Sequence, residues 1–420
     1  MRILFIHPNF PGQFKHIAAH LAKNPNNEVI FACTYTNKLN IPGIRTVISR
    51  PKSSPTNSTT HRYVTSFEKA VYSAQSIWRV CHKLKQSGFV PDVIYAHPGW
   101  GDGMLLKDIY PDTPYIAYME FYYHAFGADV HFYPNEKLSP DRIAKIRLKN
   151  ATNLINLSSC DWAISPTHWQ AGLHPNDFHH KFSVIHEGID TNNLTPKKNN
   201  PKLTLPNGDQ LPVHAEIVTY AARNFEPYRG FEQVMRSISL LMKERPNAHF
   251  LMIGGDDVSY GSKLPNGRTY REKLLQEIDL DETRLHWFGK LPYDEYHEVL
   301  KHSMAHIYMT IPFVLSWSLL EAMAIGCPIV ASNTAPVVEV IKDGKNGLLA
   351  DFFSPDKIAK HVVTLLNNPA LRKQYAVNAR ETIIQKYSTN KILPLYEELI
   401  TNIANGDLHA AKQLAPPKII

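Results

Sequence analysis

The residues best placed to do chemistry lie between positions 312 and 336, where an acid follows two serines near a predicted helix start. An apolar run gives way to Ser316 and Ser318, which are good N-cap residues, and the helix should end at Gly326. The unpaired N–H groups of a helix N-terminus favour an anion. Glu321 has two interpretations: it completes a capping box with Ser318, three residues earlier, or it binds a ligand.

Two arginines supply a second candidate for anion binding. Arg223 follows a predicted strand, and Arg229 stands immediately before Gly230 and the next predicted helix. A guanidinium can grip phosphate oxygens through two parallel hydrogen bonds, each worth about 1.5–3 kcal/mol. The pattern therefore predicts a phosphate site at this strand end, with simple solvation of the arginines as the alternative.

A turn with a single glycine follows the first predicted strand. That strand ends at His7, and an amphipathic helix starts near Gln13, directly after Gly12. Gly12 would let the backbone approach a ligand closely, and the helix N-terminus favours negative charge. A dinucleotide-binding fingerprint needs three glycines, so it is not present, and a plain strand-to-helix turn is the alternative.

Polar and aromatic residues cluster after two further predicted strands. Residues 95–103 include His97 and Trp100, and residues 118–127 include Glu120, Tyr122 and His124. Trp100 and Tyr122 could stack on a sugar ring, because aromatic faces suit the apolar faces of sugars. Helix capping and a core histidine would explain Glu120 and His124 equally well.

The order of strands and helices predicts two α/β domains. Apolar strands alternate with helices through residues 1–190 and again through 216–385, which is typical of doubly wound parallel sheets. Residues 191–215, rich in Asn, Pro and Lys, predict an interdomain linker. Ligands of such sheets bind at the carboxyl ends of strands, so we expect function in a cleft between the two sheets. The strands are expected at 3–7, 29–33, 93–96, 115–119, 162–165, 182–186, 217–222, 249–253, 285–288, 305–309 and 329–331.

Length and net charge limit the number of domains and the possible partners. A chain of 420 residues suits two domains of about 200 residues each. Its net charge of +7 is spread along the chain, so it permits an anionic membrane, a nucleotide or a nucleic acid as partner and selects none. The sequence predicts neither a signal peptide nor a membrane span, and we expect a cytoplasmic protein.

No metal site and no cofactor are expected. The adjacent acids Asp256 and Asp257 have no further run of ligands after them. The four cysteines lack paired spacing and are expected to be buried structural residues: Cys33, Cys81, Cys160 and Cys327.

The segment LLEAMAIGCPIVAS, followed by Glu339 and by DGKNGLLAD, resembles the signature of the retaining glycosyltransferases of family 4, nucleotide-sugar enzymes with the GT-B fold. The resemblance covers nearly the whole chain and includes HEGID at 186–190. It implies two Rossmann-like domains facing across a cleft, with a last helix in 386–420 returning to the first domain. It also implies that Glu321 binds the ribose hydroxyls. A second family Glu, which contacts the transferred sugar, is replaced here by Phe313.

The resemblance implies further roles for the candidates. It places the Gly12 loop at the diphosphate and the donor sugar, and Glu120 near a position where many members have a sugar-contacting His. Where the family has Arg and Lys five residues apart, this chain has Arg223 and Arg229, six apart. The loop at 286–296 resembles one that lies against the nucleotide base. The nucleotide-sugar candidates are then Gly12, Gln13, Arg223, Arg229, Phe288, Gly289, Lys290, Leu291, Ser316, Trp317, Ser318 and Glu321. The catalytic candidates are Glu120, His124, Arg223 and Arg229, and the acceptor-binding candidates are His97, Trp100 and Tyr122.

We therefore predict a retaining, metal-independent hexosyltransferase. It would move a sugar from a UDP- or GDP-linked donor to a saccharide or lipid-linked acceptor bound by the first domain. Basic and apolar residues alternate at 76–85 and 142–150, which predicts peripheral contact with the inner face of an anionic membrane, with ordinary solvated helix faces as the alternative. Two other functions stay open. One is a degenerate, non-catalytic nucleotide-sugar-binding protein, because of Phe313; the other is transfer to nucleic acid, for which the sequence shows no clustered basic stripe.

Overall fold

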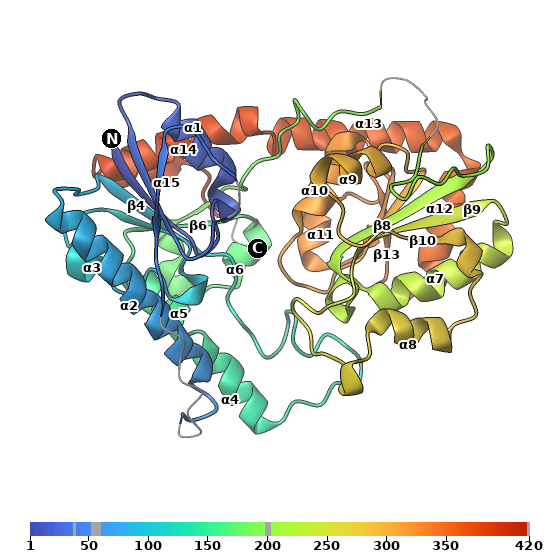
Figure 1. Ribbon diagram of the computed structural model, residues 1–420, viewed down its shortest axis with the longest axis horizontal. Helices are drawn as coiled ribbons and strands as arrows, with labels where there is room; N and C mark the ends of the chain where they lie inside the picture. The colour runs from blue at the N-terminus through green and yellow to red at the C-terminus, as the bar shows by residue number, and fades with distance from the viewer. Residues whose placement is uncertain (37–38, 52–59, 198–202, 418–420) are drawn as a thin grey trace. The chain divides into compact units, whose positions relative to one another are not determined.

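A computed structural model describes residues 1–36, 39–51, 60–197 and 203–417 of the chain (Figure 1). The chain forms two compact units. The first consists of Met1–Gly188 together with Thr389–Ile420, and the second of Ile189–Ser388. The chain therefore passes between the units twice, at Gly188 and again at Ser388.

The first unit is built on a parallel sheet with the strand order β3-β2-β1-β4-β5-β6-β7. Helices cover both faces because the strands are continuous apolar runs: Ile3 and Phe5 enter one core cluster, whereas Leu4 and Ile6 enter the cluster on the opposite face. The strands are β1 (Arg2–Ile6), β2 (Glu28–Cys33), β3 (Ile44–Ile48), β4 (Val93–Ala96), β5 (Tyr115–Tyr118), β6 (Trp162–Ser165) and β7 (Phe182–Val184). The helices before the crossing are α1 (Lys15–Ala22), α2 (Thr65–Gln86), α3 (Leu106–Ile109), α4 (Pro140–Lys149), α5 (Ala151–Ser159) and α6 (His168–Gly172).

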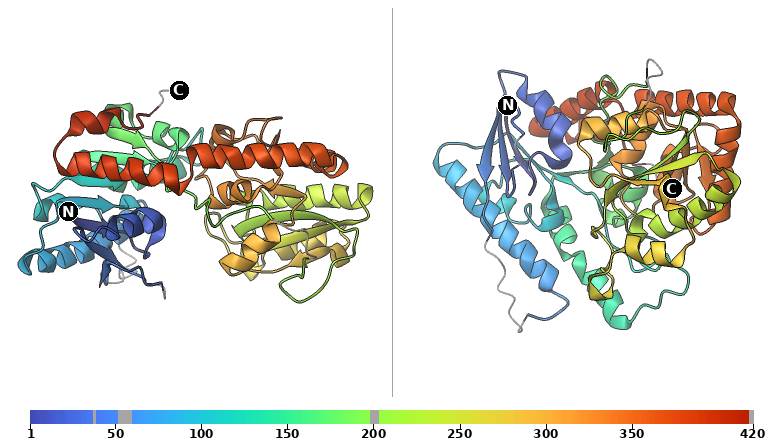
Figure 2. Two further views of the ribbon diagram at one scale, coloured as in Figure 1. Left: turned by 90° about the horizontal axis from the view of Figure 1, so that it is seen from above. Right: turned by 45° about the vertical axis from the view of Figure 1, so that its right-hand side comes forward.

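The last two helices, α14 (Thr389–Ala404) and α15 (Leu408–Gln413), complete the first unit. Figure 1 shows α14 lying beside α1, and its buried face shares a core cluster with β1 and β4. The Tyr396 hydroxyl donates to the Ile185 carbonyl at 3.0 Å. Beyond α15 the chain runs beside β7, where Val184 N–H donates to the Ala415 carbonyl at 2.7 Å (Figure 2). The predicted return of the last helix to the first domain is confirmed.

The second unit holds a parallel sheet with the strand order β10-β9-β8-β11-β12-β13. Its strands are β8 (Glu216–Asn224), β9 (Ala248–Gly255), β10 (Leu285–Trp287), β11 (Ala305–Tyr308), β12 (Ile329–Ser332) and β13 (Leu348–Ala350). Its helices are α7 (Phe231–Glu244), α8 (Tyr270–Glu277), α9 (Tyr293–Leu300), α10 (Trp317–Ile325), α11 (Ala335–Val340), α12 (Pro355–Asn367) and α13 (Pro369–Lys386). The predicted fold class, two doubly wound parallel-sheet domains, is confirmed.

The segment 191–215, for which the sequence predicted a linker, falls inside the second unit. Leu203 and Leu205 are buried in one core cluster with Leu251 and Ile253 of β9. Residues 198–202 lie outside the described residues. The stretch is rich in turn-forming residues, yet its two leucines bury enough apolar surface to bind it to the sheet.

Three sequence expectations concern the chain as a whole. All four cysteines are buried and unpaired, as predicted. Among the described residues, no helix has the length and apolarity needed to cross a membrane. Within the same residues, no three His, Cys, Asp or Glu side chains group as metal ligands would.

The buried histidine of β11 makes the stability of the second unit sensitive to acid. His306 is fully buried, its ring bonds through Nδ1 to the Thr219 hydroxyl at 2.8 Å, and burial lowers its pKa from 6.5 to about 4. Between these two pH values the unfolded chain takes up a proton that the folded chain excludes. Stability present above the unfolded pKa is therefore lost as the pH falls.

We predict that this histidine removes about 2 kcal/mol from the free energy of unfolding between about pH 7 and about pH 5. Urea unfolding of the parent and of His306→Asn at both pH values checks this, because the variant should show a smaller pH dependence. His61→Asn, which replaces an exposed histidine, is the control. Equal pH dependence in all three proteins would contradict the prediction.

Candidate functional site

Arg229 sits in a tight turn between β8 and α7. The turn is a short 3-10 helix, Pro227–Arg229, and it closes on Gly230, whose φ is +64°. A Cβ on Gly230 would lie 2.5 Å from the Cβ of Met309. Glycine is required there both for the left-handed backbone and for the close approach to Met309. The tight turn that carries Arg229 therefore depends on Gly230.

The guanidinium of Arg229 is buried among neutral oxygens. Its Nη1 donates to the Thr310 hydroxyl at 2.9 Å, the Val314 carbonyl at 3.2 Å and the Tyr308 hydroxyl at 3.4 Å. The ring of Tyr260 lies 5.5 Å from the guanidinium carbon. Burial disfavours the charge, but the phenol groups of Tyr308 and Tyr260 outweigh it and keep the pKa of Arg229 above its ordinary value.

Arg229 is only 8% exposed, and among the described residues no carboxylate lies within ion-pair distance of it. A buried charge is costly unless it is paired. The three hydrogen bonds all use Nη1, and the Tyr260 side chain also bonds to the guanidinium, so every partner of this cation is neutral. This arrangement can bind an oxyanion, and a phosphate is the group that a guanidinium fork matches best.

Arg223 differs from Arg229 in its surroundings. It lies at the end of β8, is exposed, and has no hydrogen-bond or ion-pair partner within the described part of the chain. The two predicted phosphate ligands therefore differ in their surroundings: three hydrogen bonds hold Arg229, and Arg223 is exposed to solvent.

The N-terminus of α10 lies next to the Arg229 guanidinium. Ser316 caps this helix, since its Oγ accepts the N–H of Ser318 at 3.3 Å. The Ser316 N–H donates to the Tyr308 hydroxyl at 3.0 Å, and this hydroxyl also accepts from Arg229. Trp317 is the first residue of the helix. The helix N-terminus and the buried guanidinium thus share one phenol as a neighbour.

The capping-box interpretation of Glu321 is wrong. With Ser316 as the cap, Glu321 lies in the second turn of α10, too far along to reach the cap N–H. It is 6% exposed and accepts a hydrogen bond from the Tyr293 hydroxyl at 2.8 Å. Burial raises the pKa of Tyr293, and the neighbouring Glu321 carboxylate adds to the effect. Glu321 is therefore a buried, oriented acid outside the cap.

The predicted base loop follows β10. Phe288 and Leu291 pack against the cluster that holds Leu205, so both side chains are partly occupied by the core. The Gly289 carbonyl accepts the Gly254 N–H at 2.8 Å, and Lys290 is exposed. Of the main-chain groups expected to read a base, the Gly289 carbonyl is thus already engaged.

In the first unit, a chain of hydrogen bonds runs from β1 to Glu120. The Asn9 N–H donates to Nδ1 of His7 at 2.9 Å, which places the ring proton on Nε2. Nε2 then donates to Gln13 Oε1 at 2.6 Å, and Gln13 Nε2 donates to Glu120 Oε1 at 2.8 Å. Burial and the charge of His97 lower the pKa of His7 to about 3, so the ring is neutral.

The other oxygen of Glu120 faces His97. Nε2 of His97 lies 3.5 Å from Oε2, and the Gly99 N–H donates to Nδ1 of the same ring at 3.2 Å. Burial opposes ionisation of Glu120, but His97 and Gln13 together bring its pKa below the ordinary value. The Trp100 ring, 46% exposed, lies 4.7 Å from that of His97. The result is an ionised carboxylate, fixed in orientation, beside an exposed aromatic face.

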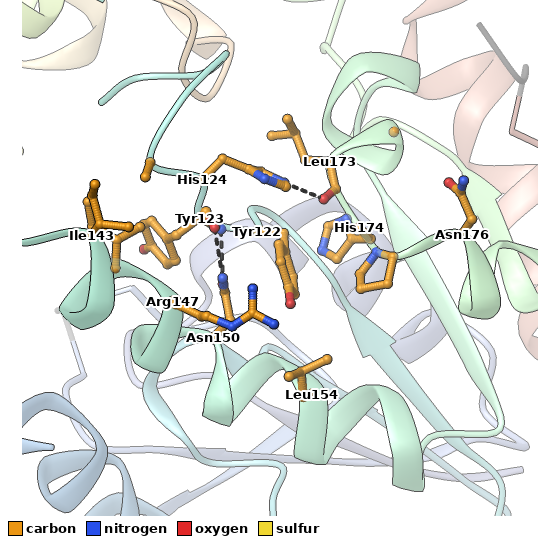
Figure 3. A pocket seen from close by; sticks show the side chains of 14 residues that line it. Tyr122, Tyr123, His124, Ile143, Arg147, Asn150, Leu154, Leu173, His174 and Asn176 are labelled. Carbon is orange, nitrogen blue, oxygen red and sulfur yellow. Dashed lines mark hydrogen bonds between the residues drawn. The ribbon is translucent and has the colours of Figure 1, made fainter. Parts of the chain in front are cut away.

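Tyr122 and His124 line a separate hollow of about 560 Å³ in the same unit (Figure 3). Asn150 shapes it by accepting the Tyr123 N–H at 2.9 Å and donating to the Tyr123 carbonyl at 2.7 Å. The His124 ring bonds through Nε2 to the Leu173 carbonyl at 2.7 Å. Arg147 contributes the one cationic side chain of the lining, which contains no acid among the described residues.

The structure thus gathers twelve of the sequence-predicted residues into three groups, and it leaves five outside them: Arg223, Phe288, Gly289, Lys290 and Leu291. One contains Gly12, Gln13, His97, Trp100 and Glu120; the second contains Arg229, Ser316, Trp317, Ser318 and Glu321; the third contains Tyr122 and His124. Sequence reasoning missed His7, Tyr293 and Tyr308. Tyr293 lies within the predicted base loop and Tyr308 at the end of a predicted strand, so the same two motifs contain both residues.

Comparison with known families identifies matches to both halves of the chain. Residues 25–194 match the Glycosyl transferase family 4 group, and residues 208–382 match the Glycosyl transferases group 1. The D-inositol 3-phosphate glycosyltransferase of Corynebacterium efficiens is 27% identical over 237 residues, which are 54% of this chain and 53% of the relative. The N-acetyl-alpha-D-glucosaminyl L-malate synthase of Bacillus anthracis is 23% identical over 193 residues, 46% of this chain and 47% of the relative. The chain spans about half the length of the curated relatives it matches.

Solved structures share the fold over the full length. Sucrose-phosphate synthase from Thermosynechococcus elongatus aligns with a TM-score of 0.70 and 16% identity, covering 97% of this chain and 100% of the other. Anabaena HepE, solved in complex with UDP-glucose, aligns with a TM-score of 0.68 and 15% identity, covering 96% of this chain and 100% of the other.

We predict that a side chain at Gly12 destabilises the first loop. Its φ is +51°, and an added Cβ would lie 2.4 Å from the His7 ring. Gly12→Ala should lower the free energy of unfolding by about 1–3 kcal/mol more than backbone strain alone would, because the His7 ring must move. Gly127→Ala is a matched control, since its φ is +81° and nothing lies within 4 Å of its added Cβ. Chemical unfolding of both variants measures the difference, and equal losses would contradict the prediction.

Proposed function

Because the chain belongs to the group 1 glycosyltransferases of family 4, we propose that it transfers a sugar from a nucleoside-diphosphate donor to an acceptor hydroxyl. The observation that carries the proposal is the buried guanidinium of Arg229, which has no carboxylate near it among the described residues and is surrounded by neutral oxygens. A diphosphate would supply the negative charge that this group lacks.

The donor would bind along the residues around Tyr308 in the second unit. Its phosphates would meet Arg229 and the N–H groups at the start of α10, with Arg223 closing from solvent. Its ribose hydroxyls would donate to the buried Glu321 carboxylate, which Tyr293 orients. Phe288, Gly289, Lys290 and Leu291 would lie against the base, UDP or GDP being the nucleotides expected. HepE, which shares the fold, was solved with UDP-glucose.

The reaction breaks the bond between the anomeric carbon and the leaving phosphate oxygen and forms a bond to the acceptor oxygen. The family resemblance implies retention of the anomeric configuration, in which the acceptor attacks the face from which the phosphate leaves. The leaving phosphate would then take the acceptor proton on that face, and no dedicated base would be needed. Arg229 would stabilise the charge that develops on the diphosphate, and this supports catalysis without a metal ion.

The acceptor would be a saccharide or a lipid-linked sugar held by the first unit. Glu120 is ionised and its side chain is 24% exposed, so it can accept a hydrogen bond from an acceptor hydroxyl. Trp100 offers an exposed face for the ring, and the hollow with Tyr122 and His124 extends the surface. Exposed Leu148 in the basic helix α4 and exposed Leu154 in α5 support contact with an anionic lipid surface.

One observation favours a second candidate function, a nucleotide-sugar-binding protein without transfer. Phe313 packs against the rings of Tyr228 and Tyr260, so an aromatic group stands where the family resemblance expects a sugar-contacting carboxylate. Turnover of donor with any acceptor would exclude it.

We predict that one of UDP, GDP or ADP raises the thermal midpoint of the full-length chain. A nucleotide at 100 times its dissociation constant stabilises a protein by about 2.7 kcal/mol. Arg229→Lys keeps the charge but loses the planar fork, and should weaken binding about 10- to 100-fold. Arg236→Lys, on the exposed face of α7 beside Glu232, is the matched control. No shift with any nucleotide would contradict the proposed function.

We predict that Glu120→Gln impairs use of the acceptor. Loss of a charged hydrogen bond costs about 1.5–3 kcal/mol, so kcat/KM for the acceptor should fall about 10- to 100-fold. Binding of the nucleotide in the second unit should not change. Glu28→Gln, which alters an exposed acid of β2, is the control. Unchanged acceptor kinetics, measured by product formation at saturating donor, would remove Glu120 from the site.

A further inference from the structure

A loop after β9 is held in place by one buried carboxylate. Glu226 is fully buried, and its side chain accepts the N–H groups of Ser259 at 3.0 Å, Tyr260 at 3.0 Å and Gly261 at 2.8 Å. Three converging amides can satisfy a buried carboxylate without a cation. The Asn224 side chain adds a hydrogen bond from Nδ2 to the Ser259 hydroxyl at 2.6 Å.

The clamped loop presents Tyr260 to two other aromatic rings. The Tyr260 centroid lies 5.0 Å from that of Phe313 and 5.9 Å from that of Tyr228, and the Phe313 and Tyr228 rings meet edge to face at 5.2 Å. We call these three residues the aromatic wall. The wall borders the anion site, because the Tyr260 ring also lies 5.5 Å from the Arg229 guanidinium.

The members of the wall differ in exposure. Tyr260 is 39% exposed, whereas Phe313, whose ring packs against it, is 9% exposed. Aromatic faces bind the C–H patches of sugar rings, and a guanidinium binds phosphate. The combination of a phosphate-binding cation and an adjoining aromatic surface suits a ring joined directly to a phosphate, which is the structure of a glycosyl phosphate.

We propose that the aromatic wall binds the transferred sugar of the donor and that Glu226 is the positioning residue that holds Tyr260 in the wall. The inference rests on the proposed function and extends it: in this chain an aromatic surface takes the sugar at the position where the family resemblance expects a carboxylate. The sugar is then recognised by its C–H face rather than by hydroxyl hydrogen bonds to an acid.

Calorimetric titration of the full-length chain with a nucleoside diphosphate and with its sugar conjugate separates the two parts of the donor. UDP and UDP-glucose, and GDP and GDP-mannose, are the probes. Phe313→Ala should weaken binding of the sugar conjugate about five- to tenfold and change the affinity for the free diphosphate less than twofold. Tyr260→Ala also removes a ring that lies against Arg229, so it should weaken binding of both ligands, and the loss for the sugar conjugate should be about five- to tenfold larger than the loss for the diphosphate. Tyr260→Phe keeps the ring and should bind as the parent does. Leu240→Ala, on an exposed position of α7, is the control.

The role of Glu226 is tested by a double-mutant cycle. Glu226→Gln should weaken binding of the sugar conjugate to a similar degree. Adding Tyr260→Ala to Glu226→Gln should lower this affinity by less than a further twofold, because both changes remove the same ring from the wall. Each variant is first checked for a parent-like thermal midpoint.

Four results would decide against the inference or its premise. The aromatic wall is not a sugar site if Phe313→Ala and Tyr260→Ala weaken binding of the diphosphate and of the sugar conjugate equally. It is not a sugar site either if the two variants weaken binding of neither ligand. Additive effects of Glu226→Gln and Tyr260→Ala would overturn the positioning role. Failure of the parent chain to bind any diphosphate or conjugate would instead overturn the proposed function on which the inference rests.

Discussion

The buried positive charge of Arg229 is the constraint around which the second unit is organised. The guanidinium is held by the Thr310 hydroxyl, the Val314 carbonyl and the Tyr308 phenol, and none of these carries a charge that could neutralise it. Burying a charge in this way costs free energy that folding must supply elsewhere. A site that retains such a charge is preorganised for an anionic ligand, since the cost of orienting the cation is met before the ligand arrives.

The neighbouring elements follow from that constraint. The Tyr308 hydroxyl joins Arg229 to the start of α10, so the cation and the helix N-terminus favour the same charge. The first unit shows the opposite electrostatics: Gln13 and His97 hold Glu120 as a carboxylate. We propose that the second unit binds the anionic diphosphate and that the first unit binds the acceptor hydroxyl, since sugar transfer from a diphosphate requires both.

The sequence predicted the sheets well because central parallel strands are continuous apolar runs. It missed β3, whose residues are mostly exposed or half-buried and carry no such run, and it missed the short β13. The linker was misplaced because turn-forming composition concealed the burial of Leu203 and Leu205. The position of Arg229 beside a predicted strand end identifies it as a candidate phosphate ligand. The burial of Arg229 and the exposure of Arg223 depend on tertiary packing, so the sequence does not predict them.

The remaining errors arise from contacts between residues far apart in sequence. The spacing of Ser318 and Glu321 fits a capping box, yet the true cap is Ser316, which the Tyr308 hydroxyl holds from β11. Glu226 was passed over because its three partners lie more than thirty residues away, at 259–261. Local pattern identified where chemistry could occur, and long-range hydrogen bonds decided which side chains are fixed there.

A crystal structure of the full-length chain grown with UDP-glucose or GDP-mannose would show whether a nucleoside diphosphate binds at Arg229. We expect diphosphate oxygens within hydrogen-bond distance of the Arg229 guanidinium and ribose hydroxyls on the Glu321 carboxylate. A nucleotide bound with its phosphates away from Arg229, or with its ribose away from Glu321, would show that this assignment of the site is wrong.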